Sequence, residues 1–197
     1  PIQEQIKVKG KRSYSPRLNT ADKERNSASE KDEYVCACFD TSKLLFFNGT
    51  GGFSPDGKEY IIYLPKGHYT PAPWINVVSN GKFGFQVSEA GGGYTWSENS
   101  RENKLTPWSN DPVSDPHGEV FYVRNDENGD YWSITPGPIR GNADYIISHG
   151  FGYTTFEQTS HGIEHRLTEF VPMDDPVKVC ITALRNVTAK TKNLSIM

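Results

Sequence analysis

Short apolar runs, separated by Gly, Pro, Asn and Asp, recur along the chain from Tyr34 onward. The runs are too short for typical helices, and several alternate apolar and polar positions as half-buried strands do. Many short strands at this spacing predict an antiparallel β-sandwich or barrel. The predicted strands are Tyr34–Phe39, Leu44–Phe47, Glu59–Leu64, Trp74–Ser79, Phe83–Ser88, Val120–Arg124, Tyr131–Ile134, Tyr145–His149, Tyr153–Ser160, Ile163–Val171, Val177–Asn186 and Lys192–Met197.

Several junctions between these strands have the residues of tight turns. Asp56-Gly57, Asn80-Gly81 and Asn128-Gly129 resemble two-residue hairpin turns, whose central residues both tolerate positive φ. His161-Gly162 is a fourth turn of this kind in composition. The strand Val177–Asn186 is followed by a turn, and Lys192–Met197 is its predicted partner.

Residues 1–33 differ from the rest, because they are polar and mixed in charge with few apolar anchors. Asn19–Glu30 is compatible with a short surface helix, although a linker or frayed extension fits the composition better. The chain starts at Pro1 and stops in the middle of a strand pattern. We therefore expect a polar extension over residues 1–33 and a sandwich domain over 34–197, truncated at its C-terminus, cut from a larger protein.

Composition narrows the function. Net charge is −3 and the pI is about 6.0, which argues against a nucleic-acid partner. Aromatic residues make up 12% of a chain that is only 35% hydrophobic, a combination that suits pleated sheets. No apolar run approaches the roughly 20 residues of a membrane span, and the N-terminus is too polar for a secretory signal. Three cysteines make no disulfide framework, so we expect Cys36 and Cys38 to be reduced and buried.

The segment Glu89–Asp115 shows neither strand alternation nor a helical period. Loops of this length in a compact domain are usually functional or disordered. Two Trp, one Tyr and one Leu are too much apolar surface for disorder, so we predict an ordered loop that meets a polar ligand.

The side chains of this loop suit a sugar. Aromatic rings stack on the C–H faces of sugars, while charged and amide groups bind the hydroxyls. The alternative is that the tryptophans anchor the loop to its own sandwich while Arg101 and Glu102 pair locally. The candidate residues are Trp96, Arg101, Glu102, Asn103, Trp108, Asn110 and Asp111.

Other constellations predict no chemistry. Gly49–Gly52 lacks the Lys-Ser/Thr pair and the helix of a phosphate-binding loop, so a tight crossing between strands is expected. His161 and His165 would lie roughly 13 Å apart along a strand, too far to share a metal ion. Paired carboxylates could serve glycoside hydrolysis, but the sequence cannot place them. These loop acids are Glu89, Glu98, Glu102, Asp111 and Asp115. We predict no metal site, no cofactor and no catalytic residue in this chain.

Four segments resemble the N-terminal sandwich of the glycoside phosphorylase family (glycoside hydrolase family 94, formerly glycosyltransferase family 36), which includes cellobiose and chitobiose phosphorylases. The likeness is closest to the phosphorylase-like module of cyclic β-1,2-glucan synthases, and it covers roughly residues 44–197. The segments are Phe46–Tyr60, Thr70–Phe85, Val87–Asp115 and His149–Pro176.

This resemblance implies a supersandwich of the galactose-mutarotase type, followed in family members by a helical linker and a catalytic (α/α)₆ barrel. The general acid is an Asp of that barrel, and phosphate attacks the anomeric carbon with inversion. The barrel is not part of this sequence, so the catalytic and phosphate-binding residues are not expected here. In the family, loops of the sandwich lie beside the active site, in some members across a dimer interface. The segment from Tyr94 to Asp111 is the best match to such a loop.

The leading hypothesis is therefore a non-catalytic domain that packs on a barrel and shapes its sugar site. A self-sufficient carbohydrate-binding module is the alternative, and a complete small glycosidase is the weakest reading. The expected partners are a β-glucan or oligosaccharide, the rest of the parent chain and a homodimer partner. A synthase of this type implies the cytoplasmic side of an inner membrane.

Overall fold

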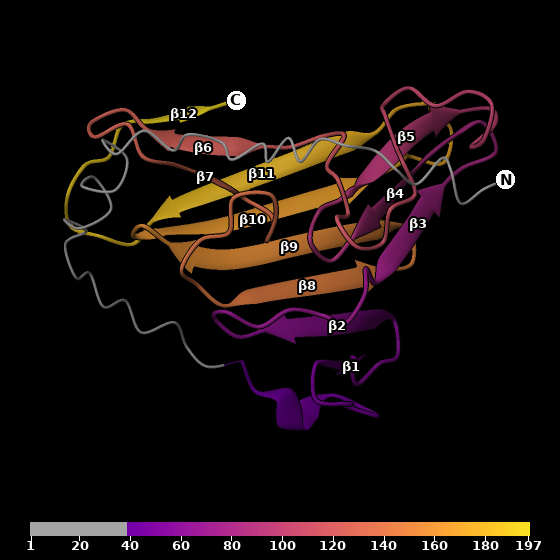
Figure 1. Cartoon of the computed structure of the whole chain (residues 1–197). Coiled ribbons are helices and arrows are strands. Elements are labelled where there is room, and N and C mark those ends of the chain that lie inside the picture. The colour runs from indigo at the N-terminus through magenta and orange to yellow at the C-terminus, as the bar shows by residue number, and fades with distance from the viewer. Residues whose placement is uncertain (1–38) are drawn as a thin grey trace, which may run out of the picture. The chain divides into compact units, whose positions relative to one another are not determined.

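The computed structural model describes residues 39–197, and Figure 1 shows them as a set of antiparallel sheets. The predicted all-β sandwich is confirmed. The only helix in this range is a 3₁₀ turn, η1 (Thr41–Lys43), which Asp40 caps by accepting a hydrogen bond from the Ser42 backbone N–H. No helix among residues 39–197 is long and apolar enough to cross a membrane.

One layer of the sandwich is a six-stranded antiparallel sheet with strand order β1-β2-β8-β9-β10-β11. Its last four strands are consecutive along the chain, and each pairs with the next. Short turns join β8 to β9 and β9 to β10, whereas the longer loop 171–178 joins β10 to β11. Between β2 and β8 the chain leaves this sheet and builds the second layer. The strands are β1 (Gly51–Phe53), β2 (Glu59–Leu64), β8 (Tyr145–Gly150), β9 (Tyr153–Ser160), β10 (Ile163–Phe170) and β11 (Val179–Asn186).

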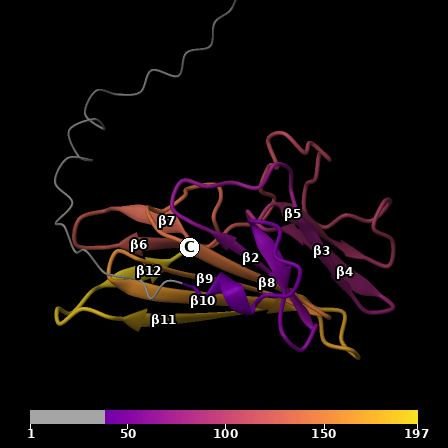
Figure 2. The same ribbon diagram turned by 90° about the horizontal axis from the view of Figure 1, so that it is seen from below.

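The second layer consists of two three-stranded sheets with orders β3-β4-β5 and β12-β6-β7. In Figure 1 the first covers the right-hand part of the large sheet, and the second lies toward its upper left. Figure 2 shows both on the same side of the large sheet. The strands are β3 (Ile75–Ser79), β4 (Phe83–Ser88), β5 (Gly93–Ser97), β6 (Tyr122–Asn125), β7 (Tyr131–Ser133) and β12 (Leu194–Ile196).

One apolar core lies between the layers. Phe156 comes from the large sheet, Phe85 from β4 and Trp132 from β7, and each is at most 2% exposed. Burial of such side chains stabilises a fold by roughly 1.5–3 kcal/mol each. Alternation fixes the inward faces: along β10, Ile163, Leu167 and every second residue between and after them are buried.

Most predicted strands are present, with ends shifted by one or two residues. Leu44–Phe47 is wrong, because Phe46 adopts a left-handed φ of 54° and turns the chain after a single bridge between Leu45 and Phe53. The adjacent β1 was not predicted, since its two glycines obscure the pattern. The predicted strand Tyr34–Phe39 (apart from its last residue), the possible helix Asn19–Glu30, and Cys36 and Cys38 lie outside the described residues.

The predicted pairing of the last two strands is also wrong. β11 pairs with β10, whereas β12 leaves the large sheet and pairs with β6. The turn after β11 therefore carries the chain from one layer to the other. Local alternation cannot show this, because it indicates which face of a strand is buried and not which strand is its partner.

All four predicted turns connect neighbouring antiparallel strands. A pair of positive φ angles was expected at the first three turns, but among the four it occurs only at the fourth, at His161 (55°) and Gly162 (69°). At Asp56-Gly57 and Asn128-Gly129 only the glycine has positive φ, and at Asn80-Gly81 neither residue does.

Candidate functional site

The prediction that Glu89–Asp115 is a loop without strands is wrong, because the segment contains β5. β5 pairs with β4 in a register that sets Thr95 opposite Phe85 and Trp96 opposite Gly84. The strand was hidden by its glycine-rich start. Gly93 approaches the β4 backbone so closely that an added Cβ would lie 1.9 Å from the Gln86 carbonyl oxygen.

β5 alternates between the core and the outer face of the small sheet. Thr95 faces inward with Phe85, whereas Tyr94 and Trp96 lie on the opposite face. The Tyr94 ring stacks on Trp108 at 4.6 Å and contacts Trp96 at 5.3 Å. Tyr94 is 7% exposed, and the two indoles, both half-buried, are the accessible parts of this aromatic platform (Tyr94, Trp96 and Trp108). The structure therefore brings three of the predicted residues together.

Gly84 provides the space in which Trp96 lies. A Cβ at Gly84 would come within 2.5 Å of the Trp96 ring and 2.6 Å of the Ser79 Cβ. We expect Gly84→Ala to displace the indole and to lower the free energy of unfolding by about 1–3 kcal/mol, as overpacking does. Urea unfolding and tryptophan fluorescence measure both effects. Gly81→Ala is the matched control, because nothing lies within 4 Å of its Cβ position; equal costs for the two variants would contradict this account.

The chain after β5 folds back along it. The Leu105 N–H donates to the Thr95 carbonyl oxygen at 2.8 Å, and Lys104 is bridged to Trp96. The Lys104 ammonium lies 5.5 Å from the Trp108 ring centre and 5.8 Å from that of Tyr94. This cation–π arrangement adds a positive charge to the platform. Lys104 was not predicted, because its relation to the rings depends on this backbone pairing.

Two threonines attach the segment to the half-buried carboxylate of Glu119. Thr95 and Thr106 both donate hydroxyl hydrogen bonds to Oε1 of Glu119, the second at 2.9 Å. Oε2 of Glu119 accepts from the Lys178 ammonium at 2.8 Å. Burial raises the pKa of Glu119, but the Lys178 charge and these hydrogen bonds outweigh it and lower the pKa below its usual value. The carboxylate is thus held ionised beneath the platform.

Lys178 joins the half-buried Glu119 to the buried Glu169. Its ammonium also lies 3.0 Å from Glu169 Oε1 and 4.5 Å from the Phe85 ring centre. Burial alone would lower the pKa of Lys178, but the two carboxylate charges raise it. The Glu119–Lys178–Glu169 cluster therefore anchors the platform to the large sheet.

Three polar candidates, Arg101, Glu102 and Asn103, lie in the exposed turn after β5. Arg101 and Glu102 pair with each other at 3.1 Å, and both side chains are more than two-thirds exposed. Their backbone N–H groups donate to the Asn99 side-chain oxygen, which fixes the turn. Asn103 is also exposed. Arg101 and Glu102 therefore pair locally, as in the alternative in which they do not bind a sugar, although both groups stay accessible to a ligand.

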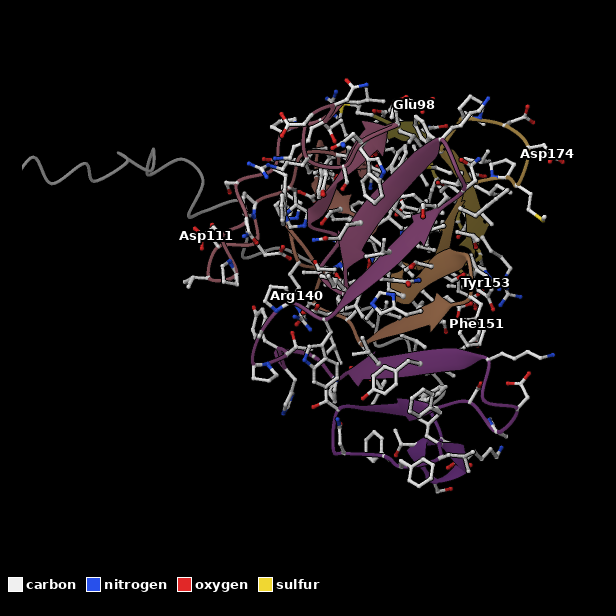
Figure 3. All side chains as sticks on the ribbon, turned by 90° about the vertical axis from the view of Figure 1, so that its right-hand side faces the viewer. Glu98, Asp111, Arg140, Phe151, Tyr153 and Asp174 are labelled. Atoms are coloured by element: carbon white, nitrogen blue, oxygen red, sulfur yellow. The ribbon has the colours of Figure 1, made fainter. Side chains whose placement is uncertain are left out.

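Asn110 and Asp111 belong to a different turn. Asp111 accepts hydrogen bonds from the Val113 N–H and the Ser114 hydroxyl, and the latter lowers its pKa most. Asn110 has a left-handed φ of 51°. Figure 3 shows Asp111 and Glu98 at separate corners of the molecule, although both come from the long segment. The candidates therefore fall into two groups, of which only the first adjoins the platform through β5.

Two other acids of the segment have structural partners. Glu89 is 5% exposed and accepts hydrogen bonds from the Thr70 hydroxyl and the Trp74 backbone N–H. Burial raises its pKa, and the charge of Asp115 adds to the effect. Asp115 accepts from the Ser88 hydroxyl.

The two spaced histidines contact one tryptophan. The His161 ring stacks on Trp132 at 3.9 Å, and the Trp132 indole N–H donates to His165 Nε2 at 2.9 Å. His161 lies in the predicted turn between β9 and β10, so the two histidines do not both lie along one strand, as the distance of roughly 13 Å had assumed. Over residues 39–197, no group of three or more His, Cys, Asp or Glu side chains could hold a metal ion.

Comparison with known proteins identifies relatives. The cyclic beta-(1,2)-glucan synthase NdvB of Rhizobium meliloti (strain 1021) is 38% identical over 170 residues, which are 85% of this chain and 6% of that protein. The N,N'-diacetylchitobiose phosphorylase of Vibrio proteolyticus is 32% identical over 148 residues, 74% of this chain and 18% of the relative. Solabiose phosphorylase of Paenibacillus borealis is 27% identical over 159 residues, which are 75% of this chain and 19% of that protein.

The chain thus spans less than a fifth of the length of these relatives. A family model described as "Glycosyl hydrolase 94, supersandwich domain" matches residues 58–197. This range includes β2 to β12, and therefore both layers of the sandwich and the platform. The chain belongs to the glycosyl hydrolase 94 family, of which it carries the supersandwich domain.

Proposed function

We propose that this domain is non-catalytic and that it forms part of the sugar site of a cyclic β-1,2-glucan synthase or a related phosphorylase. The observation that carries the proposal is the aromatic platform on the outer face of β3–β5. Two accessible indoles, a lysine above the rings and the exposed Arg101–Glu102 turn supply the stacking surface and hydrogen-bonding groups that a sugar needs.

The proposed partners follow from the same reading. The relatives are glucan synthases and oligosaccharide phosphorylases, which supports a carbohydrate ligand and an enzymatic parent. The domain would pack on an (α/α)₆ catalytic barrel of its own parent chain, and the platform would complete the sugar pocket, either there or across a homodimer. For a synthase parent, we place the domain on the cytoplasmic side of the inner membrane.

The purified chain is expected to show no phosphorolysis of β-1,2-glucan, because in this proposal the reacting acid belongs to another domain. Binding of the glucan is expected to be weak, in the millimolar range, since hydroxyls left unpaired by half a pocket gain little. Release of glucose 1-phosphate and calorimetric titration measure the two quantities. Turnover above that of a heat-denatured control would refute the non-catalytic role.

The alternative function is a self-sufficient carbohydrate-binding module. The observation that favours it is that both indoles of the platform are accessible in the domain alone. Micromolar binding of β-1,2-gluco-oligosaccharides by the chain alone, lost in Trp96→Ala or Trp108→Ala, would support the module. Met173→Ala is a suitable control, because this 90% exposed side chain lies in the loop between β10 and β11.

A further inference from the structure

A second concave surface lies away from the platform, where the ends of β2, β3 and β8 meet. It is a groove of about 330 Å³. The groove is near the lower limit of typical ligand pockets, which are about 300–1,000 Å³. Its aromatic walls are Phe53, Tyr60, Trp74 and Phe151.

The rings in these walls meet at steep angles rather than stacking flat on one another. Phe53 meets Tyr60 edge-on at 5.1 Å, with 83° between the rings, and Tyr60 meets Trp74 at 5.9 Å and 68°. Phe53 is 43% exposed and Phe151 is 83% exposed. Figure 3 shows Phe151 at the tip of the β8–β9 turn, next to Tyr153. The groove therefore has apolar faces available for stacking.

The polar framework of the groove is fixed. Asn76 donates to the carbonyl oxygens of Gly150 and Tyr153 at 3.1 and 2.9 Å. His149 is hydrogen-bonded through both ring nitrogens, to the Trp74 carbonyl oxygen and the Thr154 hydroxyl. Burial lowers the pKa of His149 to about 4, so its ring is neutral near pH 7. These bonds hold the walls in place without a ligand.

Two charged side chains also line the groove, and they favour a hydroxyl-rich ligand over a protein partner. Lys58 and Glu59 are neighbours on β2 and its turn. Glu59 accepts a hydrogen bond from the Tyr153 hydroxyl through Oε1, and Oε2 accepts none from the described residues. The core of a protein interface is depleted of charge, because a buried charge must be desolvated. A hydroxyl-rich ligand avoids this cost, since its hydroxyls replace the water around both groups.

The groove is assembled from distant parts of the chain. Its lining residues come from three segments, 53–60, 74–76 and 149–151, which the fold brings to one place. All of them except Phe53 and Gly57 lie within residues 58–197, the range that the family model matches. The groove therefore belongs largely to the supersandwich domain.

We propose that this groove is a second carbohydrate-binding site, which takes a short segment of a β-linked glucan against Phe53, Trp74 and Phe151. The proposed ligand class rests on the proposed function, but the site is separate from the platform. Pyranose C–H faces would stack on the aromatic walls, and Glu59 Oε2 and the Lys58 ammonium would bind hydroxyls.

The test is a titration of the ¹⁵N-labelled chain with β-1,2-linked glucotriose, up to about 10 mM, followed by amide chemical shifts. Saturating shifts are expected at Gly57, Lys58 and Gly150. Phe151→Ala removes a stacking ring that is mostly exposed, so the fold is retained. It is expected to raise the Kd measured at the groove about three- to tenfold. Met173→Ala and Trp96→Ala should leave this Kd unchanged.

The outcomes separate this site from the platform. Shifts confined to Tyr94–Trp108 would overturn the groove site and leave the proposed function standing. Shifts confined to the groove, lost in Phe151→Ala, would support the inference while removing the platform as a sugar site. No shift at either place would overturn both. Shifts at the groove with the apolar dye anilinonaphthalene sulfonate but not with the trisaccharide would overturn the inference, since they would indicate an apolar partner.

Discussion

Lys178→Met is expected to lower the free energy of unfolding by about 3–5 kcal/mol, chiefly because it leaves the buried carboxylate of Glu169 without its cation, and also removes the partner of the half-buried Glu119. The Lys178 side chain is 13% exposed and lies 2.8 Å from Glu119 and 3.0 Å from Glu169. Methionine has a similar length, so the loss is one of charge rather than of packing. Urea unfolding monitored by tryptophan fluorescence measures the change.

Loss of the cation should also loosen the platform. Glu119 holds Thr95 and Thr106, and an unpaired Glu119 would become protonated or draw in water. Hydrogen exchange at the amides of Thr95 and Leu105 is therefore expected to speed up more than exchange in β8 and β9.

Lys58→Met is the matched control, since Lys58 pairs with Asp56 at 3.6 Å with its side chain 74% exposed. An exposed pair of this kind contributes less than about 1 kcal/mol. The double variant Lys178→Met with Glu169→Leu should recover part of the loss, because it removes one of the orphaned charges. If Lys178→Met costs no more than Lys58→Met, the interior cluster does not anchor the platform.

The sequence was sufficient for the fold class because short runs with apolar residues, separated by turn residues, recur along the chain. β9 and β10 were predicted within one residue, and Phe156 and Leu167 on them are buried in the core. Where a strand begins with glycines, as β1 and β5 do, the side-chain pattern is too sparse to show it. Sheet membership was also beyond a local pattern, as the transfer of β12 to the second layer shows.

The sequence predicted which aromatic residues form the platform but not how they are arranged. Tyr94, Trp96 and Trp108 meet because β5 is a strand whose alternate residues share a face. The same alternation directs Thr95 inward to Glu119, a residue that no motif marked. The groove joins residues about 75 and 90 positions apart in sequence, such as His149 with Trp74 and Tyr153 with Glu59. Such contacts depend on the pairing of β2 with β8, which residue patterns alone do not specify.

The fold is expected to lose stability as the pH falls from 6.5 toward 4, because two interior histidines must stay neutral. Burial, assisted for His165 by the charge of His161, lowers the pKa of His149 and of His165 to about 4, against a usual value of about 6.5. The folded state then binds fewer protons than the unfolded state in this window. Stability is therefore complete above pH 6.5 and declines as the pH drops, by about 3 kcal/mol for each histidine at pH 4.

His165 gives the sharper test, since its Nε2 accepts the Trp132 indole N–H and protonation would remove that acceptor. His165→Gln supplies a non-titrating acceptor, so unfolding free energies measured between pH 7 and 4 should decline less steeply than in the unmodified chain. Burial raises the pKa of Glu89, which works in the opposite direction and offsets part of the decline in both proteins. His68→Gln, at an exposed position, should leave the slope as it is. Equal slopes for His165→Gln and the unmodified chain would show that protonation of the buried His165 imidazole does not lower the free energy of unfolding in acid.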